Sequence, residues 1–190
     1  MYGAAQPGAR AGRIMRTPRL MFSACATIDA EDRCRNAELA IGDELRAALE
    51  AFPGVFCSVE EAAMVLAEEV DELWDEVRAN RIGRARAEAV QVGAMALRFV
   101  ADLYESGPAS ERYAAAAREC HCVIGDVGPV GRTLASSHEG FGYLKREYES
   151  LWSAVRFDDP ARPAAVRVAA MAVRFIAEIS GRSPVQGLVR

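Results

Sequence analysis

The segment from Leu66 to Val77, LAEEVDELWDEV, holds six acidic side chains among its twelve residues and no basic one. On a helix, Glu68 and Glu72 lie one turn apart on the same face, and Glu69 is three residues from Glu72, so the three carboxylates can converge. Six acid pairs of the segment lie three or four residues apart, and their repulsion costs about 1–3 kcal/mol in all, which a protein of ordinary stability tolerates. An oxygen-only cluster of this kind suits a hard octahedral cation, above all magnesium.

The elements that would position these acids are helices. Alanine, leucine, glutamate and arginine dominate the chain, and apolar residues recur at spacings of three and four. This pattern predicts an all-α protein with glycine- and proline-containing breaks between its helices. Six helices are expected, over residues 29–51, 58–79, 84–104, 110–124, 138–157 and 161–179. The second begins with a capping box, Ser58 followed by Glu61.

The second half of the chain repeats the first. The segment 58–78 aligns without gaps on 136–156, and seven of the thirteen residues from Gln91 to Leu103 are identical in 167–179. The repeat predicts two three-helix units, over residues 29–105 and 109–180. Since each unit exposes an apolar face, we expect them to pack as a pseudo-dimer within one chain, in a single helical bundle.

The repeat keeps core positions and loses the acids. The aligned changes are Glu68 to Arg146, Glu72 to Ser150, Glu88 to Ala164 and Gln91 to Arg167. Acids that only solvated an outer face would have little reason to disappear together. Because Glu88 belongs to the helix that follows the acidic segment, it can add a fourth carboxylate to a metal site in the first unit.

These residues carry a family resemblance. An EExxE element, complete here as Glu68, Glu69 and Glu72, is followed on the next helix by EAVQ, which supplies Glu88 and Gln91. Together they resemble the all-α nucleoside triphosphate pyrophosphohydrolases of the MazG type over residues 58–103, and in degenerate form over 138–179. The resemblance departs from the family pattern at Gln91, where the family has aspartate.

The resemblance implies hydrolysis of a nucleoside triphosphate or deoxynucleoside triphosphate to the monophosphate and pyrophosphate. It implies a Mg²⁺ site, with Mn²⁺ as a substitute, and a glutamate that accepts a proton from water. The implied metal ligands are Glu68, Glu69, Glu72, Glu88 and Gln91, and the catalytic glutamates are Glu69 and Glu72. Because an amide oxygen is a weaker ligand than a carboxylate, a catalytically inactive relative that binds a nucleotide or a protein partner is the alternative. A helical oligomerisation module with merely solvated acids is a third.

Three arginines are candidate substrate ligands: Arg98, Arg146 and Arg167. Arg98 recurs as Arg174 in the second unit, and either contacts phosphate or has a structural role such as pairing with a carboxylate. Arg146 and Arg167 replace acidic or amide side chains, so they either neutralise the degenerate site or bind phosphate directly.

Composition limits the remaining functions. The 190 residues are 51% apolar with a net charge of −4, which indicates a globular protein and gives no electrostatic case for binding nucleic acid. No apolar run is long enough for a membrane span. Five cysteines at irregular spacing favour a reducing, cytoplasmic location. Residues 1–28 are expected to form a flexible basic tail and 181–190 a C-terminal tail, and a homodimer stays open.

Overall fold

The computed structural model describes residues 19–179, with side chains from Ala30 onward. This part of the chain folds into six α-helices and one short 3-10 turn, with no strand, as the sequence predicts. The elements are α1 (Arg19–Ala51), α2 (Val59–Arg78), α3 (Ile82–Tyr104), α4 (Ala109–Val123), η1 (Ile124–Asp126), α5 (Ser137–Arg156) and α6 (Arg162–Ile179). None of the described helices is both long and apolar enough to cross a membrane.

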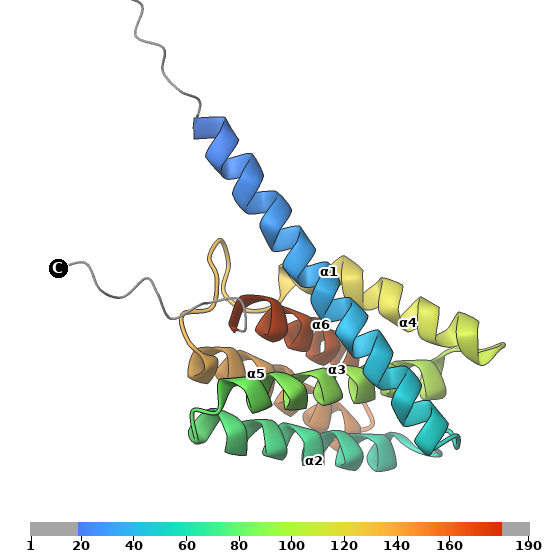
Figure 1. Ribbon diagram of the computed structural model, residues 1–190. Helices are drawn as coiled ribbons and strands as arrows, with labels where there is room; N and C mark the ends of the chain where they lie inside the picture. Colours follow the sequence, from blue (N-terminus) through green and yellow to red (C-terminus); the bar gives the residue numbers. More distant parts are fainter. Residues whose placement is uncertain (1–18, 180–190) are drawn as a thin grey trace, which may run out of the picture.

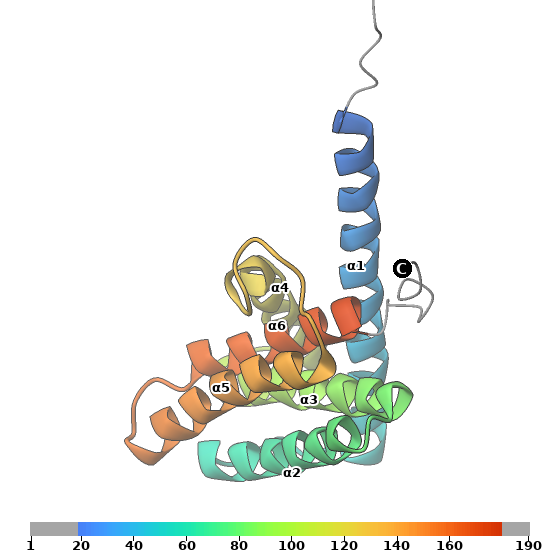
Figure 2. The same ribbon diagram turned by 90° about the vertical axis from the view of Figure 1, so that its left-hand side faces the viewer.

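The helices form three layers. The central helices α3 and α6 pack against each other, with α2 and α5 on one side and α1 and α4 on the other (Figure 1, Figure 2). Every residue from 92 to 101 of α3 is buried. A helix that is apolar on all sides has to lie at the centre of such an arrangement, because no face of it can be left in water.

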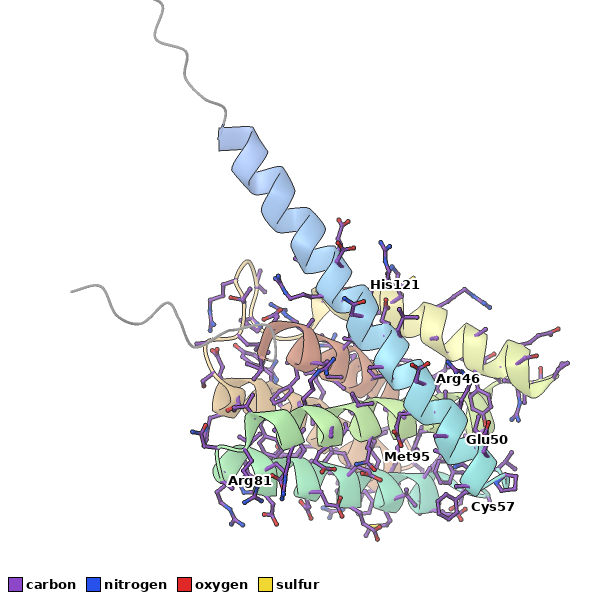
Figure 3. All side chains as sticks on the ribbon, viewed as in Figure 1. Arg46, Glu50, Cys57, Arg81, Met95 and His121 are labelled. Atoms are coloured by element: carbon purple, nitrogen blue, oxygen red, sulfur yellow. The ribbon has the colours of Figure 1, made fainter. Side chains whose placement is uncertain are left out.

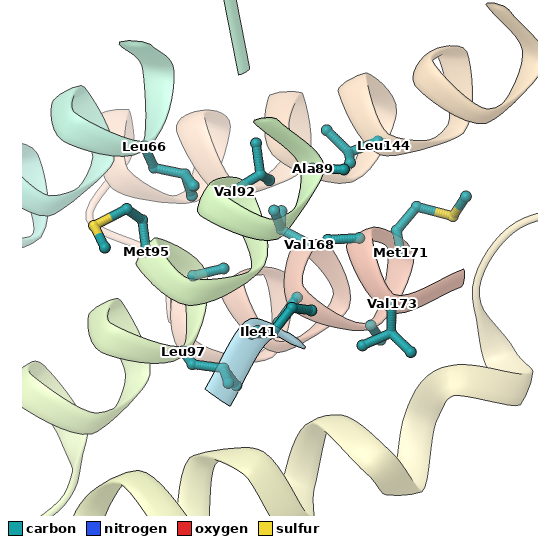
Figure 4. Close-up of a cluster of buried hydrophobic side chains, with 14 of the residues drawn as sticks. Ile41, Leu66, Ala89, Val92, Met95, Leu97, Leu144, Val168, Met171 and Val173 are labelled. Atoms are coloured by element: carbon teal, nitrogen blue, oxygen red, sulfur yellow. The ribbon is translucent and has the colours of Figure 1, made fainter. Parts of the chain in front are cut away.

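The core contacts follow the repeat. Leu66 of α2 and Leu144 of α5, which are aligned in the repeat, are both fully buried. The aligned pair Val92 of α3 and Val168 of α6 is buried between the outer layers. Figure 4 shows these four side chains together, with Ile41 of α1 reaching the central pair from the other side. The apolar periodicity of the sequence therefore marks the helix faces that pack between the layers.

The helix starts repeat as well. The Ser58 hydroxyl accepts a hydrogen bond from the backbone of Glu61 at 3.1 Å, and the Ser136 hydroxyl accepts one from Glu139 at 3.1 Å. Each glutamate in turn accepts from the backbone of the residue before the serine, at 2.7 Å for Glu61 and 2.5 Å for Glu139. The N-cap expected at Ser58 is confirmed, and an equivalent cap begins α5. In both, the glutamate bonds one residue earlier than in a capping box, where it would accept from the N–H of the serine itself.

The first helix is longer than the sequence analysis predicts. It begins at Arg19 instead of residue 29, so part of the expected tail is helical. The physical reason is that no glycine or proline interrupts the chain between Pro18 and Gly42. The rest of the two predicted tails, residues 1–18 and 181–190, lies outside the described residues, as does residue 180.

A glycine fixes how closely α1 approaches the central layer. A Cβ atom added at Gly93 of α3 would lie 2.5 Å from Cδ1 of Ile41 and 3.4 Å from Cβ of Ala172. Gly142 of α5 is also helical, but a Cβ there would meet nothing within 4 Å. The two glycines therefore separate the effect of crowding from the effect of adding a side chain to a helix.

We predict that Gly93→Leu lowers the free energy of unfolding by about 1–3 kcal/mol, because the core cannot take the added volume without shifting α1. The matched change Gly142→Leu should leave stability equal or raised by up to about 1 kcal/mol, because leucine favours a helix over glycine. Urea unfolding of both variants measures the difference. Equal effects of the two substitutions would contradict the close packing of α1 on α3.

Candidate metal centre

Two helices bring three of the predicted acids together. Glu69 and Glu72 lie on α2, and Glu88 lies on the antiparallel α3, after a tight turn in which Asn80 adopts a positive φ of 54°. One carboxylate oxygen of each glutamate lies within 4.8 Å of those of the other two. Two ligands of one magnesium ion are at most about 4.2 Å apart, so a small contraction of this cluster would allow a single ion to bind all three.

One carboxylate oxygen of Glu69 is buried without a hydrogen-bond partner. The Oε2 atom of Glu69 has almost no contact with solvent and makes no hydrogen bond. Burial, together with the neighbouring carboxylates of Glu72, Glu88, Glu44 and Glu68, raises the pKa of Glu69 to about 7. Burial, together with Glu72 and Glu76, also raises the pKa of Glu88. The site therefore favours whatever adds positive charge, a proton or a cation.

Glu68 and Gln91, two of the five predicted metal ligands, are placed differently from the other three. Glu68 is exposed and lies outside the close group formed by Glu69, Glu72 and Glu88. Gln91 does reach the cluster, but its Nε2 donates a hydrogen bond of 2.7 Å to Oε2 of Glu88. The amide therefore acts on a carboxylate of the cluster as a donor.

A cavity of about 730 Å³ lies beside the cluster and has a mixed lining. Its polar lining residues include Glu44, Glu61, Glu68, Glu69 and Gln91, and its apolar ones include Phe52, Val55, Phe56, Val65 and Met95. Met95 is labelled in Figure 3, beside the last turns of α1. A molecule with charged groups and an apolar or aromatic group matches this lining.

Sequence analysis missed Glu44. It is half-buried on α1, lines the cavity and contributes to the raised pKa of Glu69. No spacing in the sequence marks it, because α1 precedes the acidic segment and its packing onto α2 and α3 is a tertiary event. The cavity is therefore lined by carboxylates from α1 as well as from α2.

Arg98 has a structural role in the cavity wall. Its side chain is buried, its Nε donates to Asp102 at 3.3 Å, and its Nη2 donates to the backbone carbonyls of Phe52, at 2.7 Å, and Gly54. The guanidinium also lies 5.0 Å from the centre of the Phe56 ring. Arg98 thereby holds the linker between α1 and α2. These contacts agree with the structural alternative weighed for this residue.

The aligned Arg174 does the same in the other half of the chain. Its Nη2 donates to the carbonyls of Pro129, at 2.9 Å, and Arg132, at 2.6 Å, and its Nε donates to Glu178. Glu178 is aligned with Asp102, and both acids also accept from a backbone N–H of the linker that their arginine holds, at Leu134 and Phe56. The arginines kept by the repeat thus fix the loops that precede α2 and α5.

In the second half of the chain, an arginine lies beside the acid that is aligned with Glu69. Glu147 of α5 is aligned with Glu69, and only 4% of it is exposed. Arg167, aligned with Gln91, donates two hydrogen bonds to it, from Nε at 2.8 Å and from Nη2 at 3.0 Å. Arg146 approaches the same carboxylate at 3.6 Å. Both arginines therefore offset the charge of Glu147.

The two halves give an internal comparison. A carboxylate occupies the same repeat position in each, half-buried as Glu69 and buried as Glu147. Burial of a charge favours a compensating charge or a proton. In the second half a guanidinium supplies it. In the first half the cationic side chain is replaced by Gln91, which leaves the position open to a metal ion. The donor set, three carboxylates and no nitrogen or sulfur ligand, fits magnesium or manganese.

Comparison with known proteins found no protein-family profile, no curated protein and no solved structure that matches this chain.

We predict that Arg167→Met lowers the free energy of unfolding by about 3 kcal/mol, because it leaves the buried Glu147 charge without its bidentate partner. Adding Glu147→Gln to this variant should recover most of the loss, because an amide carries no charge to compensate. Arg118→Met on the exposed surface of α4 is the matched control and should change stability by less than about 0.5 kcal/mol. Urea unfolding measures all three, and an unchanged Arg167→Met protein would contradict the internal counter-ion.

The raised pKa of Glu69 predicts a pH dependence of stability without metal. Because the folded-state pKa of about 7 lies above the ordinary value of 4.5, folding favours the protonated carboxyl. This contribution is complete below the unfolded-state pKa and is lost as the pH rises towards 7. In EDTA, the free energy of unfolding should therefore fall between pH 4.5 and 7.

Glu69→Gln should flatten this profile and be more stable than the wild type at pH 8 by about 1 kcal/mol, a value reduced for the solvent that reaches the half-buried side chain. Glu60→Gln, an exposed acid on the same helix, is the control. Denaturant unfolding at several pH values measures the effect. Identical profiles for wild type and Glu69→Gln would show that Glu69 titrates normally.

Proposed function

We propose that the chain is a magnesium-dependent nucleoside triphosphate pyrophosphohydrolase, built from two tandem MazG-like units of which the first keeps a working site. The observation that carries the proposal is the partnerless buried oxygen of Glu69 within a three-carboxylate cluster. Its aligned counterpart, Glu147, already has a guanidinium partner. The EExxE element and the following Glu88 support the family assignment.

The cavity supports a polyphosphate that is bound through metal. Arg98 is the only arginine or lysine among its lining residues, and two of its nitrogens are engaged with Asp102 and the linker. Phosphate oxygens next to several glutamates would be repelled unless cations lie between them. The aromatic lining residues Phe52 and Phe56 support the binding of a planar, weakly polar group such as a nucleobase.

The proposed reaction breaks the bond between the α-phosphorus and the oxygen that bridges to the β-phosphorus. The bound cation would offset the charge of the phosphate oxygens and make a water molecule more acidic. The carboxylate of Glu69 would accept the proton of the attacking water. Glu72 and Glu88 would hold the cation. The products are a nucleoside monophosphate and pyrophosphate.

A second candidate function is that of an inactive relative that binds a nucleotide or a protein partner. The observation in its favour is Gln91, whose amide donates to Glu88 and so adds no anionic oxygen to the cluster. This candidate predicts nucleotide or partner binding without release of product. It shares the cation site with the first candidate and differs from it in turnover.

A panel of nucleoside and deoxynucleoside triphosphates with Mg²⁺ or Mn²⁺, read by product identity, tests the enzyme. We expect pyrophosphate and monophosphate in equal amounts, and a loss of kcat/KM of at least about 100-fold in Glu72→Gln. Glu60→Gln should keep the wild-type rate, and circular dichroism should show both variants folded. If the wild type binds nucleotides but releases no product from any of them, the inactive relative is the correct function.

A further inference from the structure

We propose that a second cavity, between α1 and α4, binds an organic molecule with a long apolar chain and one anionic group, of the fatty-acid carboxylate class. This cavity has a volume of about 620 Å³ and shares no lining residue with the cavity beside the acidic cluster. The inference is therefore independent of the proposed hydrolase function.

The two outer layers of the bundle are closed to different degrees. On one side of the central layer, α2 and α5 pack against each other, and the Trp74 ring stacks on Phe141 with 4.8 Å between the ring centres. On the other side, α1 and α4 both pack on α3 and α6 but hardly contact each other. They are joined by Glu38 and His121, whose side chains lie 2.8 Å apart. The cavity occupies the space that this arrangement leaves open.

The cavity has an apolar lining from four helices. Four of its apolar residues, on α1, α3 and α6, are at most 5% exposed. The hydroxyl of Tyr113 donates to Asp102 at 2.7 Å, so this side chain offers the cavity its ring. An apolar ligand would cover this surface, and the volume lies within the range of about 300–1,000 Å³ that small-molecule sites occupy. The main apolar lining residues are Ile41, Leu45, Leu49, Leu97, Tyr113 and Val173.

The charged lining residues favour an anionic group, although the whole chain has a net charge of −4. The one lining acid, Glu38, is already paired with His121. Two arginines line the cavity from opposite sides, Arg46 of α1 and Arg118 of α4. Arg46 is paired with Asp43 on the exposed surface of α1. Arg118 is exposed and makes no hydrogen bond or ion pair with the residues that the structure describes, so its guanidinium can pair with a carboxylate of the ligand.

The length of the cavity favours a chain. Ser110 and His121 both line it and are eleven residues apart on α4, which is about 16 Å along the helix axis. Figure 3 labels His121 on α4 and Arg46 on α1. An extended chain of about ten carbons is shorter than this, since each carbon–carbon bond spans about 1.5 Å. Decanoate is therefore a suitable probe.

Calorimetry of the full-length protein with decanoate, decanol and decylammonium tests the ligand class. We expect one decanoate per chain with a Kd on the order of 100 µM. Decanol should bind about fivefold more weakly, because it cannot pair with an arginine, and decylammonium more weakly still, because the arginines repel it. No binding of decanoate, or equal binding of all three probes, would overturn the inference.

A glycine of the lining allows the cavity to be filled without crowding the core. Gly42 of α1 lines the cavity, and a Cβ atom added there would meet nothing within 4 Å. Gly42→Leu should therefore occupy the ligand's space and lower the decanoate affinity at least about tenfold. Gly142→Leu makes the same change in a helix away from the cavity and should leave the affinity unchanged. Equal binding by the two variants would place decanoate elsewhere and overturn the site.

The role of the arginine has its own variant. Arg118→Met should remove the preference for decanoate over decanol and leave decanol binding within about twofold of the wild type. Arg84→Met, an exposed arginine of α3 outside the cavity, is the control and should keep the preference. A preserved preference in Arg118→Met would overturn the assignment of the anionic group. Circular dichroism confirms that each variant is folded.

The oligomeric state excludes the other occupant, a second copy of the chain. Size-exclusion chromatography should give the same elution volume for the wild type and Gly42→Leu. A wild-type dimer that Gly42→Leu converts into a monomer would show that a second copy covers the cavity, and would overturn the inference.

Discussion

A carboxylate inside a helical bundle needs a positive partner, and this requirement shapes both halves of the molecule. Glu69, which is half-buried, and Glu147, which is buried, occupy the same repeat position on α2 and α5. Glu147 has Arg167 as its partner, whereas Glu69 has four further acids nearby and no guanidinium bound to it. The layers of the bundle, its caps and its arginine-held linkers are otherwise closely alike in the two halves. The charge balance at this one position is where they diverge.

The distribution of charge also bears on what the cavity can accept. Its acids come from α1 and α2, and its arginine, Arg98, is hydrogen-bonded to the linker between these two helices. Such a site would repel a free phosphate anion and accept it only with accompanying cations. Selectivity for a metal complex would then come from the protein's negative charge, without a dedicated basic side chain.

Much of the fold could be predicted from the sequence because it depends on local patterns. The i, i+3 and i, i+4 apolar spacing gave the helices, and Ser58 with Glu61 gave the start of α2. The convergence of Glu69 and Glu72 follows from helix geometry alone. The pairing with Glu88 needed only the assumption that α3 runs antiparallel to α2. The repeat added a comparison that a single copy would not have offered.

The features that sequence analysis missed depend on tertiary contacts. Glu44 enters the cavity because α1 crosses the layer of α3, and no motif records that crossing. Glu68 belongs to the EExxE element, yet the helix turns it to the exposed side of the cavity. Arg98 was ambiguous because its partners are backbone carbonyls of a linker, which have no sequence signature. Gln91 was read as a weak ligand because the direction of an amide is visible only in its contacts.

The ion pair between Arg167 and Glu147 has a consequence for how the protein would respond to a shortage of metal. The second half of the molecule carries its counter-charge as the side chain of Arg167, so the charge balance at Glu147 would be independent of any metal. At Glu69, which has no hydrogen-bonded guanidinium, a proton would have to take the place of an absent cation.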